Sequence, residues 1–231
     1  MQKSMIKLLS IADYISLINA IFGFLSLTMI YIGEIRIAFS FILLAILADG
    51  LDGIIARKTH ESRLGEYLDS MADMISFGIA PAFFVFSIYY NDCSCFINKN
   101  VLLFIILIFF ISLSIIRLAS FPIMKNKKYF FGLPVPSSAI ILNVMAYFGV
   151  DLRIILPLVL IISFLMISKV KFPKLGLKIN AIACVLIFLT IIFDKNYAGF
   201  APLILFSAIA LYTIAGPIYF WIRDKKPKKI Q

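Results

Sequence analysis

The chain has 231 residues, of which 62% are hydrophobic and 15% are charged, and its formal net charge is +10. Its mean hydropathy is +1.03. Soluble domains are roughly 45–50% apolar, so this composition excludes an ordinary soluble domain and predicts an integral membrane protein. The positive charge does not indicate nucleic-acid binding, because no folded soluble face remains to carry a basic patch, and we expect no nucleic-acid partner.

The first ten residues, MQKSMIKLLS, lack the long apolar core and the small-residue cleavage site of a signal peptide. Lys3 and Lys7 suit an amphipathic helix that lies on the membrane surface, so we expect residues 1–10 to form such a segment. Residues 11–222 are then a single transmembrane domain, and residues 223–231 form a basic cytoplasmic tail.

Apolar segments separated by short polar breaks fill the transmembrane region. A helix needs about 20 apolar residues to cross the hydrocarbon core. On this basis the sequence predicts an all-α integral membrane protein with about eight transmembrane helices. They are expected near residues 11–32, 36–57, 65–90, 101–122, 131–149, 152–168, 178–193 and 200–222.

The distribution of Lys and Arg predicts the orientation of these helices. Eight spans place both termini on one side. Only four of the 22 Lys and Arg residues then lie on the other side, namely Arg36, Lys99, Arg153 and Lys195. Cytoplasmic loops carry the excess of Lys and Arg in membrane proteins. We therefore expect a multi-pass protein of the cell membrane with both termini in the cytoplasm.

Four aspartates stand out in residues 46–78, ILADGLDGIIARKTHESRLGEYLDSMADMISFG. Asp49 and Asp52 are three residues apart, and Asp69 and Asp73 are four apart, so each pair lies on one face of its helix. A short polar connection makes the two helices antiparallel neighbours. The four carboxylates are therefore expected in one pocket at the cytoplasmic end of the second and third spans.

The aspartates need compensating positive charge. A charged side chain at the centre of a membrane helix costs roughly 2.5–3.5 kcal/mol, and Arg57 and Arg63 offset only part of four negative charges. Mg²⁺ or Mn²⁺ prefers such oxygen ligands, so one divalent cation or a pair is expected. The alternative is that the aspartates cap helices and form salt bridges, although a cap needs only one carboxylate for each helix end.

Small residues accompany the aspartates, at Gly50, Gly53, Ala56 and Gly65. Such residues on membrane helices are often packing faces. Beside a metal site they can instead admit a nucleotide, whose phosphate would accept hydrogen bonds from the forked guanidinium of Arg57.

The motif D-x-x-D-G-x-x-A-R…G-x-x-x-D-x-x-x-D resembles the signature of the CDP-alcohol phosphotransferase family. Eight positions carry it: Asp49, Asp52, Gly53, Ala56, Arg57, Gly65, Asp69 and Asp73. The seven residues KTHESRL separate Arg57 from Gly65, where the family usually has eight. This difference affects where Ser62 and Arg63 lie relative to the nucleotide.

Further segments resemble the phosphatidylserine synthase branch of that family, namely ADMISFGIAPA, IRLASF and FFGLPVPSSA. Upstream, ADYISLINAIFG is similar to the family's first helix, N-x-x-T-x-x-N-x-x-x-G. Asn19 and Gly23 match this pattern, whereas Asp13 and Ser16 stand at its first two positions. The similarity covers about residues 10–140.

The resemblance implies a homodimeric transferase that binds a CDP-linked lipid, CDP-diacylglycerol or CDP-archaeol, with its tails among the membrane lipids. Two Mg²⁺ or Mn²⁺ ions are implied, with Asp49 and Asp69 contacting both, Asp52 one and Asp73 the other. Asp73 would also take the proton from the attacking hydroxyl, and CMP would leave. The implied CDP-lipid contacts are Asn19, Gly53, Ala56, Arg57, Ser62 and Gly65.

The expected acceptor is L-serine, a zwitterion that needs a cation for its carboxylate. Away from the signature, Arg117 is the basic residue inside an apolar run, and Lys125 and Ser76 are further candidates. The alternatives are a snorkelling or salt-bridged Arg117, a solvated Lys125 and a Ser76 that only packs.

Two other functions remain open. A sister enzyme that uses glycerol 3-phosphate or inositol phosphate would need a cluster of cations, and around the signature only Arg63 and Arg117 are found besides Arg57. A divalent-cation channel or transporter would use the aspartates as a filter, but Arg57 beside such a filter would oppose cation passage.

Overall fold

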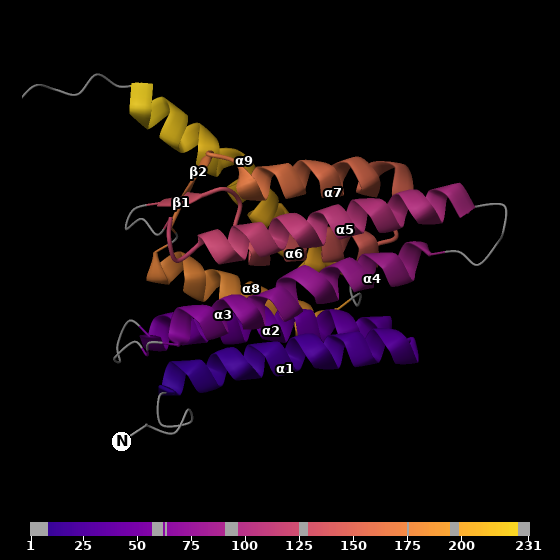
Figure 1. The fold of residues 1–231 in the computed structure, drawn as a ribbon, viewed down its shortest axis with the longest axis horizontal. Helices are drawn as coiled ribbons and strands as arrows, with labels where there is room; N and C mark the ends of the chain where they lie inside the picture. Colours follow the sequence, from indigo (N-terminus) through magenta and orange to yellow (C-terminus); the bar gives the residue numbers. More distant parts are fainter. Residues whose placement is uncertain are drawn as a thin grey trace, which may run out of the picture.

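A computed structural model describes residues 9–56, 62, 64–90, 97–124, 129–174, 176–194 and 199–225. Within them the chain is mostly helical, and a two-stranded sheet lies at the end of the bundle where the first helix begins (Figure 1). The elements are α1 (Ile11–Ile32), α2 (Ile35–Ala56), α3 (Gly65–Asp73), a π-helix η2 (Met74–Ile79), α4 (Ala80–Tyr89), α5 (Ile97–Ser120), β1 (Tyr129–Phe131), α6 (Val135–Tyr147), α7 (Leu152–Ile167), β2 (Lys171–Pro173), α8 (Leu177–Phe193) and α9 (Phe200–Lys225).

Four of the described helical segments are long and apolar enough to cross a membrane, which confirms the multi-pass, predominantly helical class. They are Ile11–Ile32, Gly65–Tyr89, Lys99–Ser120 and Phe200–Arg223. Three other apolar helices, α6, α7 and α8, have 13, 16 and 17 residues. The total of eight spans therefore stays a prediction.

The prediction of a helix over residues 131–149 is wrong at its start. Residues 129–131 form β1, which pairs antiparallel with β2, and α6 begins only at Val135. Gly132 has a φ of +71°, and a Cβ there would lie 1.9 Å from the carbonyl oxygen of Met166, so this turn requires glycine. Pro134 at the N-cap and Pro136 in the first turn then favour a helix start.

The predicted helix over residues 65–90 runs from Gly65 to Tyr89, but it is not regular. The π-helix η2 interrupts it directly after Asp73. Single π-helical turns inside α-helices occur frequently at functional sites. Here the extra residue in the turn places the buried side chain of Ser76 against α1.

Helix α1 has well-defined ends that agree with the prediction. Ser10 forms a capping box with Asp13: the Ser10 hydroxyl accepts from the Asp13 amide, and the Asp13 carboxylate accepts from the Ser10 amide at 2.6 Å. Gly33 ends the helix in the left-handed conformation, and α2 follows at Ile35. The Ser26 hydroxyl donates to the Ala38 carbonyl at 3.0 Å and joins α1 to α2.

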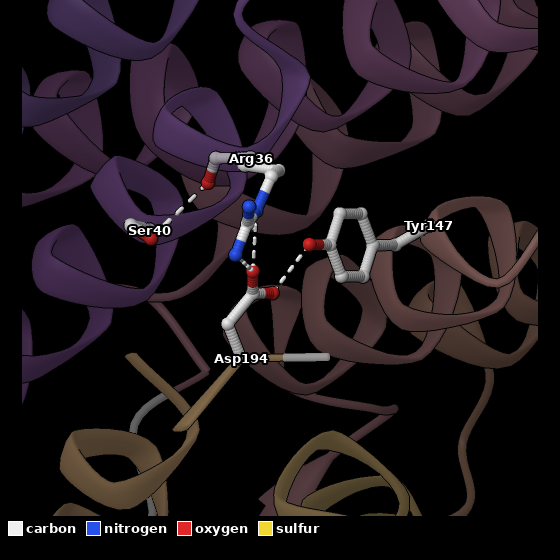
Figure 2. Close-up of polar contacts among 4 residues, drawn as sticks. All are labelled: Arg36, Ser40, Tyr147 and Asp194. Carbon is white, nitrogen blue, oxygen red and sulfur yellow. Dashed lines mark hydrogen bonds and ion pairs between the residues drawn. The ribbon is translucent and has the colours of Figure 1, made fainter. Parts of the chain in front are cut away.

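At the start of α2, a polar cluster joins three helices (Figure 2). The Arg36 guanidinium contacts the Asp194 carboxylate with an N–O distance of 2.5 Å, and the Tyr147 hydroxyl donates to the other carboxylate oxygen. Asp194 follows α8 with a φ of +45°, which is strained for a residue other than glycine. These contacts connect the start of α2 to the ends of α6 and α8.

We predict that Gly23→Ala destabilises the protein, whereas Gly50→Ala does not. A Cβ at Gly23 would lie 2.4 Å from the Ser76 hydroxyl and 2.8 Å from the Ser76 Cα atom, so the backbone of α1 or η2 would have to move. Overpacking of this kind costs about 1–3 kcal/mol. A Cβ at Gly50 meets nothing within 4 Å. Thermal unfolding in detergent would compare the two variants, and equal unfolding temperatures would contradict the close approach.

Candidate functional site

Three of the four signature aspartates form a compact cluster. Asp49 from α2 and Asp69 and Asp73 from α3 each offer a carboxylate oxygen, and these oxygens lie within 4.8 Å of one another. Asp73 is buried, and the other two are half-buried. Helices α2 and α3 thus bring three of the four carboxylates together, where the spacing predicted all four.

The fourth aspartate, Asp52, is buried but does not belong to that group of three. The Ser16 hydroxyl on α1 donates to its carboxylate at 2.7 Å. Ser16 received no role from the sequence, because the contact joins residues 36 positions apart. The first helix therefore helps to hold one of the signature carboxylates.

Asn19, one turn further along α1, is fully buried and contacts Asp73. Its side-chain amide donates to the Asp73 carboxylate at 3.0 Å. The sequence predicted Asn19 as a CDP-lipid contact, and the structure gives it this hydrogen bond to the signature aspartate. Because the contact fixes one carboxylate oxygen, it also limits rotation of the Asp73 side chain.

Ser76 lies behind this pair of residues. Its hydroxyl donates to the backbone carbonyl of Asn19 at 2.8 Å, and its side chain is completely buried. It is not among the residues that line the cavity described below. The structure therefore gives Ser76 a packing contact that supports Asn19 and Asp73.

The start of α3 lies close to the start of α1. A Cβ at Gly65 would lie 3.1 Å from a carboxylate oxygen of Asp13 and 3.5 Å from the Ser62 hydroxyl. The Ser62 hydroxyl accepts from the Leu64 amide at 3.2 Å. Glycine at position 65 allows these polar groups to approach the beginning of α3.

The remaining predicted nucleotide contacts are only partly described. Gly53 and Ala56 fall in the last turns of α2. Arg57, Arg63 and Lys125 lie outside the described residues, as do residues 1–8 of the expected surface segment and residues 226–231 of the expected tail.

A cavity of about 280 Å³ opens beside the aspartate cluster. Arg117, on α5, lines it; the residue is 9% exposed, and its Nε atom has no hydrogen-bond partner among the described residues. Carboxylates and a buried guanidinium thus share one cavity. Its lining residues are Asp49, Asp69, Ser70, Asp73, Arg117, Leu118, Phe121, Phe130, Pro134, Val135, Pro136, Ser137, Lys174, Asn180 and Tyr212.

Comparison with known proteins identifies the family. The sequence model of the CDP-alcohol phosphatidyltransferase family matches residues 9–168, which is more than half of the chain. The chain belongs to this family.

Several relatives in the CDP-alcohol phosphatidyltransferase family are similar to the chain. A protein of Methanocaldococcus jannaschii named CDP-diacylglycerol–serine O-phosphatidyltransferase is 37% identical over 75% of this chain and 78% of its own length. The archaetidylserine synthase of Methanothermobacter thermautotrophicus is 32% identical over 74% of this chain and 73% of its own. A Bacillus subtilis protein, also named CDP-diacylglycerol–serine O-phosphatidyltransferase, is 32% identical over 67% of this chain and 85% of its own length.

The CDP-alcohol phosphatidyltransferase signature supplies one wall of the cavity, and the last third of the chain supplies another. Lys174, Asn180 and Tyr212 line the cavity but lie beyond the matched residues 9–168. The sequence offered no signal for them, because neither spacing nor a motif connects them to the aspartates.

The donor atoms of the cluster fit a divalent cation. Ionised carboxylates only accept hydrogen bonds, so three of them at this separation repel one another unless a cation lies between them. Hard Mg²⁺ or Mn²⁺ prefers carboxylate oxygens to nitrogen or sulfur. Asp49, Asp69 and Asp73 therefore form a candidate centre for a divalent metal ion.

Proposed function

We propose that the protein transfers the phosphatidyl or archaetidyl group of a CDP-linked lipid to the hydroxyl of L-serine and releases CMP. The observation that carries this proposal is the single cavity that joins the aspartate cluster to buried Arg117. Such a cavity offers a metal centre for a diphosphate and a cation for the carboxylate of an amino acid. The family and the names of the relatives support the same reaction.

The diphosphate of the CDP-lipid would lie at the metal centre. Asp49, Asp69 and Asp73 would hold Mg²⁺ or Mn²⁺, and we propose two ions, with Asp52 as the fourth ligand. When bound, the ions supply positive charge that stabilises the phosphates and the leaving CMP.

The nucleotide would lie over the small residues at the facing ends of α2 and α3. We propose Gly53, Ala56 and Gly65 as the surface that admits it, with Ser62 beside Gly65 as a polar contact. Arg57 follows α2 directly and would donate its fork of N–H groups to phosphate oxygens. Asn19 would contribute mainly through the Asp73 carboxylate that it holds.

Asp73 is proposed as the general base. A serine hydroxyl needs a base within hydrogen-bond reach to become a nucleophile. The Asp73 carboxylate would take the proton while the hydroxyl oxygen forms a bond to the lipid-linked phosphorus. The bond from that phosphorus to the bridging oxygen breaks, and CMP leaves with the electron pair. The amide of Asn19 would keep the carboxylate oriented during this step.

Arg117 is proposed as the partner of the serine carboxylate. Burial of a guanidinium without a hydrogen-bond partner for Nε is costly, and an anionic group in the cavity would remove that cost. Lys125 follows α5 and stays a further proposal. Ser76 would act from behind Asp73 through its hydrogen bond to Asn19.

The distribution of Lys and Arg supports a proposal for how the protein lies in the membrane. We propose eight spans, with both termini and the active site on the cytoplasmic side, because most Lys and Arg residues belong to that side. The two-stranded sheet and the aspartate cluster would then face the cytoplasm, and the cluster of Arg36, Tyr147 and Asp194 would face outward. We further propose a homodimer.

Serine should be the preferred acceptor among family substrates. We expect the purified protein to release CMP from CDP-diacylglycerol or CDP-archaeol when L-serine is added. Glycerol 3-phosphate and inositol phosphate should give little CMP, because the described lining of the cavity holds two cations, Arg117 and Lys174, for a substrate that carries a phosphate dianion. CMP release measured with each acceptor decides between them. Preference for a phosphorylated acceptor would identify a sister enzyme, and metal-ion transport without CMP release would indicate a channel.

Asp73→Asn should separate catalysis from binding. The amide keeps the size and an oxygen that can accept from Asn19, but it cannot take a proton at neutral pH. Turnover should fall roughly 10²–10⁴-fold, while CDP-lipid still binds with metal. Asp49→Asn should weaken CDP-lipid and metal binding as well as turnover, because Asp49 is proposed to hold both ions. Near-normal turnover of Asp73→Asn would exclude Asp73 as the base.

A further inference from the structure

The wall of the cavity that contains Arg117 is a row of two cations and two aromatic rings. The Arg117 guanidinium lies over the Phe121 ring, 5.5 Å from its centroid. The Phe121 and Phe130 rings are 6.0 Å apart, and the Lys174 ammonium lies 4.8 Å from the Phe130 centroid. All four residues line the cavity that the aspartates share.

Lys174 is positioned by strand β2 and the contacts that this strand makes. It directly follows β2, whose residue Phe172 is fully buried and pairs with Phe130 of β1. The Tyr212 hydroxyl on α9 donates to the Pro173 carbonyl at 3.1 Å. A Cβ at Gly216 would lie 2.9 Å from the Pro173 ring, so α9 packs closely against this strand. Lys174 therefore follows directly after a strand that packs against both β1 and α9.

We infer that Lys174 and Arg117 together bind the carboxylate of the amino-acid acceptor, and that Lys174 thereby determines acceptor specificity. The inference rests on the proposed function. Arg117 and Lys174 line the cavity and attract a carboxylate, whereas the aspartates that also line it repel one. Neighbouring aromatic rings stabilise each cation and exclude water around it, which strengthens a charge-assisted hydrogen bond.

The two cations also give a reason why the site would discriminate between acceptors with and without a carboxylate. An acceptor without a carboxylate makes no charge-assisted contact with either cation, and a site built to pair with one substrate group discriminates strongly against an analogue that lacks it. L-serinamide differs from L-serine only in this group, so it is the matched probe. A purely structural Lys174 would not distinguish the two acceptors.

Strand β2 supplies its own control residue. Lys171, on β2, lies 5.3 Å from the centroid of the Tyr129 ring, a cation–aromatic contact like that of Lys174. Unlike Lys174, it does not line the cavity. Lys171→Met and Lys174→Met thus remove the same charge from neighbouring positions at the two ends of β2 and keep an unbranched side chain.

The experiment measures CMP release against acceptor concentration for the wild type, Lys174→Met, Lys174→Arg and Lys171→Met. For Lys174→Met we expect the KM for L-serine to rise roughly 10–100-fold, the usual effect of a lost charge-assisted hydrogen bond. Its kcat at saturating serine, its kcat/KM for L-serinamide and its affinity for CDP-lipid should change little. Lys174→Arg should retain most of the serine preference, and Lys171→Met should behave as the wild type.

Three results would overturn the inference. The first is an unchanged KM for L-serine in Lys174→Met. The second is an equal loss with L-serine and L-serinamide, which indicates a structural role. The third is a loss of CDP-lipid binding in that variant, which assigns Lys174 to the fold or the nucleotide. If instead the wild type releases CMP only with another acceptor, the proposed function fails and this inference with it.

Discussion

Mutual repulsion among three carboxylates is the constraint on which the rest of this structure depends. Asp49, Asp69 and Asp73 bring oxygens within 4.8 Å of one another inside a bundle whose surface is largely apolar. Without a cation this arrangement would separate or bind protons, so the fold has to hold the side chains in place. Helix α1 does part of this, since Asn19 donates to Asp73, and Ser16 on the same helix donates to the fourth aspartate, Asp52. The close packing of Gly23 against Ser76 sets the depth at which α1 meets the π-helix.

The other half of the cavity is built from segments distant in the sequence. The β1–β2 pair joins the chain before α6 to the chain before α8, and α9 packs on β2 through Tyr212 and Gly216. A cation–aromatic row then lines the same cavity as the aspartates. The arrangement separates two tasks. The signature helices provide the metal centre, while later segments provide the surface on which we propose acceptors are distinguished.

The sequence predicts the parts of this structure that depend on local patterns. Hydropathy predicts α1 at its observed bounds, and the spacing of the aspartates predicts that α2 and α3 bring carboxylates together, which the structure shows for Asp49, Asp69 and Asp73. Other features depend on tertiary contacts. The strand at 129–131 replaces the start of an expected helix because Gly132 fits against the carbonyl of Met166. The π-helix, the hydrogen bond from Asn19 to Asp73, and Lys174 in the cavity all arise from packing between distant segments.

The dependence of serine-supported CMP release on divalent cations tests the central claim most directly. The purified protein, with CDP-lipid and L-serine in detergent or lipid vesicles, would be assayed in excess EDTA and again after Mg²⁺ or Mn²⁺ is restored. A metal centre at Asp49, Asp69 and Asp73 predicts no turnover in the chelator and recovery with either cation. Full CMP release in excess chelator would contradict it, since the clustered carboxylates would then work without the cation that their geometry requires.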